Sequence, residues 1–143
     1  MRIAIGIIIG LALAIGLQTG CDFLSSQLFP YAPFDVFDRA RAAEVLGNRP
    51  AAANALGIFG YLVAAFAGGF AARRISRIGW TAWVPPGFLA FQAAVLALGY
   101  SLTGWGQAGA FVAALVGGMI AHNLGKTGNG ADDSESSETR VDA

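Results

Sequence analysis

Residues 52–77 read AANALGIFGYLVAAFAGGFAARRISR. The first part, residues 52–72, contains no charged side chain, and Arg73, Arg74 and Arg77 follow directly after it. A helix needs about 20 mostly apolar residues to cross ~30 Å of hydrocarbon, because each residue adds ~1.5 Å. The stretch therefore predicts a membrane-spanning helix that ends in a positively charged turn.

Three further segments have the same character, and they lie at residues 3–20, 82–102 and 107–124. Their apolar residues are continuous, whereas the strands of a membrane β-barrel alternate over ~10 residues, so we exclude a barrel. Pro85 and Pro86 are expected in the first turns of the third span, where their missing N–H groups cost little, or to kink its entry. We therefore expect an all-α integral membrane four-helix bundle over residues 1–125.

The overall composition agrees with a membrane protein and excludes several other classes. Of the 143 residues, 55% are hydrophobic and 13% are charged, whereas about 25% of the residues in soluble domains are charged. Nine basic and nine acidic residues cancel, so no nucleic-acid partner is expected. One cysteine and one histidine are too few for the usual zinc ligand set. We expect no cofactor and no metal, and we assign no catalytic residue, because no nucleophiles or carboxylates cluster in the spans.

The distribution of the basic residues predicts how the chain is oriented. Short cytoplasmic loops of membrane proteins are enriched in Arg and Lys. With four spans, five basic residues share one face of the membrane, and they are Arg2, Arg73, Arg74, Arg77 and Lys126. This places both termini in the cytoplasm, and we expect the protein in the bacterial cytoplasmic (inner) membrane.

Two segments lie outside the spans. The outer loop, residues 21–51, is rich in large apolar side chains, so we expect it to lie on the membrane interface or to cap the bundle. Within it, Asp35 or Asp38 is expected to N-cap a short helix that ends near Gly47. Residues 126–143 are dominated by small, polar and acidic residues, which predicts a disordered cytoplasmic tail.

Small residues recur at four-residue spacing in three of the spans. Such spacing places them on one helix face, where two backbones can approach closely. We predict helix-packing roles for Gly6, Gly10, Gly16 and Gly20 in the first span, Gly60, Ala64, Gly68 and Ala72 in the second, and Gly106, Ala110, Ala114 and Gly118 in the fourth. The spacing does not say whether the partner is another span or another subunit.

Two polar residues within the spans are candidates for specific contacts. Gln92, near the middle of the third span, is expected to hydrogen-bond across helices, with a pore or substrate contact as the alternative. His122, near the inner end of the fourth span, is expected to be solvated at the interface, because no carboxylate in a span accompanies it as a proton-transfer partner.

The N-terminus also resembles a bacterial lipoprotein signal peptide. Arg2 precedes an apolar core, and Leu17-Gln18-Thr19-Gly20-Cys21 resembles a cleavage and acylation site. The departure is Gln18, because that pattern has an aliphatic residue three places before the cysteine. Processing at Cys21 is therefore kept as an alternative to an uncleaved first span.

The stretch from Ala64 to Ile75 resembles a group of small bacterial inner-membrane proteins. That group is similar in having four spans, a long outer loop and a Gly-Gly-x-x-Ala-x-Arg exit from the second span, which here is Gly68-Gly69-Phe70-Ala71-Ala72-Arg73-Arg74. A second glycine pair, Gly117-Gly118, lies in the fourth span. The resemblance covers residues 1–125 and implies the topology, with no assigned activity.

Two functions remain open from the sequence. The first is a non-enzymatic structural or accessory subunit, which packs in the lipid bilayer as a homo-oligomer or with a membrane partner protein through its small-residue faces. The second is a small transporter or channel. The four-span multidrug exporters are similar in size, but they depend on a glutamate in the first span, where this chain has only small and aliphatic residues up to Leu17.

Overall fold

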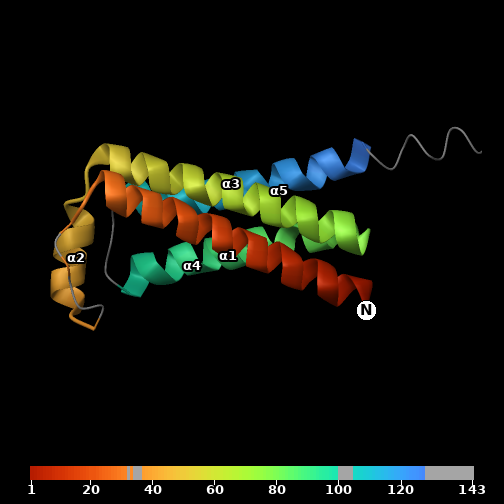
Figure 1. Ribbon diagram of the computed structural model, residues 1–143, viewed down its shortest axis with the longest axis horizontal. Helices are drawn as coiled ribbons and strands as arrows, with labels where there is room; N and C mark the ends of the chain where they lie inside the picture. The colour runs from red at the N-terminus through yellow and green to blue at the C-terminus, as the bar shows by residue number, and fades with distance from the viewer. Residues whose placement is uncertain (32, 34–36, 100–104, 128–143) are drawn as a thin grey trace, which may run out of the picture.

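The computed structural model describes residues 1–31, 33, 37–99 and 105–127, and its elements there are all helical. Helices α1 (Arg2–Leu28), α3 (Ala51–Ser76) and α5 (Trp105–Thr127) run nearly the full length of the molecule (Figure 1). A fourth rod consists of the 3-10 helix η1 (Gly79–Trp83) followed by α4 (Val84–Gly99). The short helix α2 (Arg39–Gly47) lies across one end.

Four of these elements are long and apolar enough to cross a membrane, namely α1, α3, the η1–α4 rod and α5 up to Leu124. The predicted all-α fold with four membrane-length helices is therefore confirmed. Large apolar side chains point outward along the rods; Ile8, Phe91 and Leu98, for example, are 64%, 67% and 83% exposed. Such a surface is unsuited to water and matches a hydrocarbon environment.

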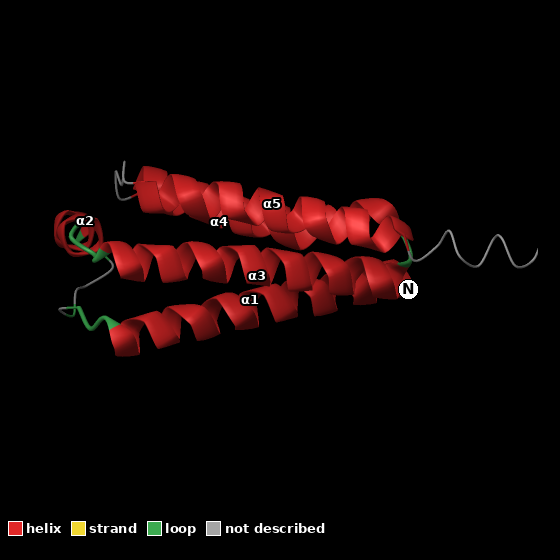
Figure 2. Ribbon diagram, turned by 90° about the horizontal axis from the view of Figure 1, so that it is seen from above, coloured by secondary structure: helices red, strands yellow, loops and turns green. Residues whose placement is uncertain are grey.

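Helix α3 lies between α1 and α5, while α4 packs mainly on α5 and also contacts α3 and α1 (Figure 2). Met1 and the end of α5 lie at the same end of the bundle (Figure 1). We call this the arginine end, because Arg2, Arg73, Arg74 and Arg77 are found there, and we call the opposite end the α2 end. The start of α1 and the end of α5 thus lie on one side, as an even number of spans requires.

Helix α1 is longer than the apolar run that predicted it. It continues past Gly20 to Leu28, so Cys21 and Asp22 lie on the helix and not at the start of a loop. The physical reason is local, since no glycine or proline follows Gly20 until Pro30. The segment expected as the outer loop thus contributes two more turns to α1.

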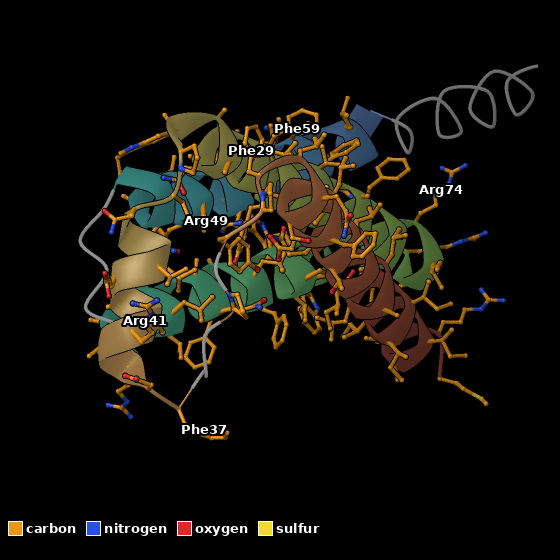
Figure 3. All side chains as sticks on the ribbon, turned by 60° about the vertical axis from the view of Figure 1, so that its left-hand side comes forward. Phe29, Phe37, Arg41, Arg49, Phe59 and Arg74 are labelled. Carbon is orange, nitrogen blue, oxygen red and sulfur yellow. The ribbon has the colours of Figure 1, made fainter. Side chains whose placement is uncertain are left out.

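Helix α2 is the short helix that the sequence predicts, and Asp38 is its N-cap. The Asp38 carboxylate accepts a hydrogen bond from the backbone N–H of Arg41 at 3.0 Å. The helix ends at Gly47, and Pro50 is the N-cap residue of α3. Phe37, just before the cap, points away from the bundle and is 90% exposed (Figure 3).

At the arginine end, α3 turns sharply into η1 and α4. Arg77 adopts the left-handed conformation with φ 61°, and its N–H donates to the Arg73 carbonyl at 2.8 Å. Pro85 and Pro86 occupy the first turn of α4, as predicted, and both are buried. The predicted tail begins at residue 126, but α5 continues to Thr127. The rest of that tail and the predicted end of the third span at residue 102 lie outside the described residues.

Candidate functional site

The contact between α1 and α3 is a backbone-to-backbone contact. A Cβ atom added at Gly10 would lie 2.6 Å from the Gly68 carbonyl oxygen, and one added at Gly68 would lie 2.6 Å from the Gly10 carbonyl oxygen. One turn along, a Cβ at Gly6 would lie 2.8 Å from the Ala72 oxygen. Only glycine permits this approach, which is the geometry that small residues at four-residue spacing produce in membranes.

Gly16 and Gly20 do not take part in this contact. A Cβ at either position would meet no atom within 4 Å. Since each residue turns a helix by about 100°, Gly16 lies about 200° around α1 from buried Ala14, and Gly20 lies about 240° around. The packing face of α1 instead runs from Gly6 and Gly10 through Ala14 to Gln18 and Ser25, all of which are buried.

The two glycine pairs each serve two neighbouring elements. A Cβ at Gly68 would meet Gly10 on α1, whereas one at the adjacent Gly69 would lie 2.6 Å from the Ala82 oxygen on η1. In α5, a Cβ at Gly117 would lie 2.6 Å from the Leu62 oxygen on α3. At Gly118 it would lie 2.8 Å from Pro86 on α4. Adjacent residues point about 100° apart, so a pair of glycines lets one helix approach two others.

The remaining small residues predicted to pack also lie inside the bundle. Gly60 faces α1, where a Cβ would lie 2.8 Å from the Cβ of Cys21, and Gly106 faces the Asn54 side chain. Full or nearly full burial is found for Ala64, Ala72, Ala110 and Ala114. Alanines also dominate the centre of the core, around Tyr61 and Leu89.

At the arginine end, side-chain hydrogen bonds connect α5 to α3 and to η1. An Arg73 side-chain N–H donates to the His122 carbonyl of α5, and the His122 Nδ1 lies 3.2 Å from the Gly79 carbonyl oxygen. The His122 and Trp83 ring centroids lie 6.1 Å apart. His122 therefore connects α3, α5 and η1, so its placement is that of a structural residue.

The other arginines of this end are exposed to solvent or headgroups. Arg2, Arg74 and Arg77 are exposed, and Figure 3 shows Arg74 at the end of the bundle opposite Phe37. The backbone of Lys126 lies in the last turn of α5, and its side chain is outside the described part. The acidic residues that the structure describes, Asp22, Asp38 and Glu44, all belong to the α2 end.

Four polar side chains that the sequence did not predict to meet lie together at the α2 end. Gln18 is 4% exposed, and its Nε2 donates to the Asp22 carboxylate at 3.2 Å. Arg49 donates to the Ser25 hydroxyl at 3.4 Å, and its guanidinium lies 5.2 Å from the Tyr31 ring centroid. We call Gln18, Asp22, Ser25 and Arg49 the Gln18 cluster.

Two atoms of the Gln18 cluster, the Gln18 Oε1 and the Arg49 Nε, are buried without a hydrogen-bond partner. A buried, unpaired polar atom normally has a bound water or a ligand nearby. The sequence signal for the cluster is the spacing of Gln18, Asp22 and Ser25 along one helix face. That signal is visible only once α1 is known to continue beyond Gly20.

Gln92 lies on the outside of the bundle. Its side chain is exposed on α4, beside the exposed rings of Phe88 and Phe91. It makes no hydrogen bond within the described residues. The expected contact of Gln92 with another span is therefore not made inside one copy of the chain, and the residue does not line its interior.

Comparison with protein-family models gives no match for this chain, and neither does comparison with curated proteins or with solved structures. The similarity to small inner-membrane proteins, drawn from residues 64–75, therefore stays a prediction. Within the described ranges, no three His, Cys, Asp or Glu side chains gather to form a metal site. The geometry on which a function can rest is thus the glycine contacts, the Gln18 cluster and the exposed Gln92.

Proposed function

We propose that this chain is a non-enzymatic structural or accessory subunit of the bacterial cytoplasmic membrane. The observation that carries the proposal is the glycine contact between helices, in which backbones touch at Gly10 and Gly68 and again at Gly117 and Leu62. In lipid, association of helices depends on such close packing, because no hydrophobic force draws apolar helices together. A bundle built in this way is a rigid unit that can support a second membrane component.

The proposed orientation has both termini in the cytoplasm. Its support is that Arg2, Arg73, Arg74 and Arg77 lie at one end with no described acidic residue beside them. At the α2 end, Asp22, Asp38 and Glu44 accompany three arginines, which are Arg39, Arg41 and Arg49. Basic residues near span ends are retained on the cytoplasmic side during insertion, whereas acidic residues contribute little to orientation.

The subunit proposal is tested by reconstituting the purified protein into liposomes and measuring the flux of a panel of ions, sugars and amino acids. We expect flux no greater than that of protein-free liposomes. A saturable flux of any one solute would contradict the proposal.

One observation favours a small transporter as a second candidate. The buried, unpaired Oε1 of Gln18 lies inside the bundle, where a polar solute could donate the missing hydrogen bond. The same liposome assay distinguishes the two candidates. Under the transporter alternative a solute flux appears and is lost in Gln18→Leu, whereas Val112→Leu, at an outward-facing position of α5, leaves it unchanged.

A further inference from the structure

The outer face of α4 carries a polar group where lipid would otherwise lie. Gln92 is exposed on this face, 13 residues after the start of the η1–α4 rod at Gly79 and seven residues before its end at Gly99. Seven residues of helix correspond to about 10 Å, so the amide lies well inside the hydrocarbon layer. An amide without partners at this depth is costly, because lipid tails offer no hydrogen bonds.

The residues around Gln92 form a continuous exposed seam. Phe88, Gln92, Val95 and Gly99 are spaced by four, three and four residues, and all are exposed. This is the spacing of a seam between two helices that cross at a small angle. A Cβ at Gly99 would meet no atom within 4 Å, so the seam is open at its outer end.

From these observations we infer that the chain forms a homodimer in which the α4 seam of one copy packs against the same seam of a second copy. The inference deepens the proposed subunit function and rests on its membrane topology. Two copies insert with the same orientation, so a twofold axis along the membrane normal brings every seam residue opposite its counterpart at the same depth. Among possible partners, a second copy is therefore certain to present an amide at the depth of Gln92.

The chemistry of the side chain favours pairing with itself. A glutamine amide has two N–H donors and one carbonyl acceptor, so two Gln92 amides can each donate to the other across the axis. A polar residue at a single seam position also fixes the register of the two helices. The large exposed rings of Phe88 and Phe91 then cover the pair from lipid.

Cysteine cross-linking in native membranes tests the seam. In a chain whose native Cys21 is replaced by Ala, Val95→Cys keeps Gln92 and should give a cross-linked dimer. The matched control is Val112→Cys on α5, since Val112 is 56% exposed and Val95 is 49% exposed. Val112 lies seven residues after the start of α5 at Trp105, and Val95 lies four residues before the end of α4 at Gly99. Equal cross-linking at the two positions, or none at Val95, would overturn the inference.

The amide pair is tested by measuring dimerisation in lipid vesicles by energy transfer between labelled copies. The wild-type chain should dimerise, and Gln92→Leu should weaken dimerisation by about 3- to 30-fold, the range given by interhelical side-chain hydrogen bonds. Because Gln92 is exposed in the single chain, its replacement should leave thermal unfolding unchanged when this is measured at a dilution at which both chains are monomeric. A wild-type chain that stays monomeric at every protein-to-lipid ratio would overturn the dimer. That result would not contradict the subunit proposal, which the liposome flux measurement tests separately.

Discussion

At the residue scale, the molecule depends on the difference between glycines that touch a neighbouring backbone and glycines that do not. Gly10 is within van der Waals distance of Gly68, whereas Gly16, six residues later on the same helix, faces open space. The sequence shows both in equivalent Gly-x-x-x-Gly patterns, so spacing alone does not separate them. The distinction comes from how α1 is rotated about its own axis. All its buried residues together determine that rotation, including Ala14, Gln18 and Ser25.

This difference predicts the outcome of a matched pair of substitutions. Gly10→Leu forces α1 away from the Gly68 carbonyl, so we expect it to lower the free energy of unfolding by about 1–3 kcal/mol, the usual cost of overpacking. Gly16→Leu should change it by no more than about 0.5 kcal/mol, as for an unconstrained surface position. Thermal unfolding in detergent measures both. Equal losses of stability in the two variants would show that the α1–α3 contact is not as described.

A second prediction at this scale concerns the Gln18 cluster. Gln18→Leu removes one hydrogen bond to Asp22 but also removes the buried Oε1 that lacks a partner. An unsatisfied buried group costs about 1–3 kcal/mol, and a typical hydrogen bond contributes about 0.5–1.5 kcal/mol. We therefore expect a change between a loss of about 0.5 kcal/mol and a gain of about 2.5 kcal/mol in stability. A loss of more than about 1 kcal/mol, measured by unfolding, would mean that a bound water or ligand satisfies the Gln18 oxygen.

At the element scale, the sequence predicts a helix end only where capping or helix-breaking residues mark it. Asp38 before Arg39 and Gly47 before Pro50 are standard start and stop signals, and α2 follows them. The end of α1 was not predictable in the same way, because hydropathy falls at Gly20 while the backbone has no reason to stop until Pro30. The length of an apolar run indicates how much of a helix can lie in the hydrocarbon layer. The helix itself ends only near a residue such as Pro30 that interrupts helical hydrogen bonding.

The N-cap of α2 predicts a local effect. Asp38→Ala leaves the Arg41 N–H without its side-chain acceptor, which costs about 1 kcal/mol and corresponds to about fivefold faster amide exchange. Hydrogen exchange measured over residues 41–47 tests this. The control is Glu44→Ala, which removes only the exposed Arg41–Glu44 ion pair and should have a smaller effect. Exchange that is equally fast in both variants would argue against the cap.

At the scale of the whole molecule, the four spans and their order were predictable from composition and apolar length. The arrangement around α3 was not, because every span is rich in small residues and could pack against any other. The placement of Gln92 was likewise beyond the sequence, since a glutamine in a span is compatible with an inward or an outward position. Its outward position became evident only from the face of α4 that α1, α3, α5 and η1 leave uncovered.

The central claim is that the chain crosses the membrane four times with its arginine end in the cytoplasm. It is tested most directly by single-cysteine labelling with a membrane-impermeant thiol reagent in spheroplasts, in a Cys21→Ala chain. The substituted positions are all exposed and lie at both ends of the bundle: Arg2, Phe37, Arg74, Trp105 and Asn123. We predict labelling at 37 and 105 in intact spheroplasts, and labelling at 2, 74 and 123 only after the membrane is permeabilised. Labelling of position 74 in intact spheroplasts, or of positions 2 and 123 on different sides, would contradict the topology.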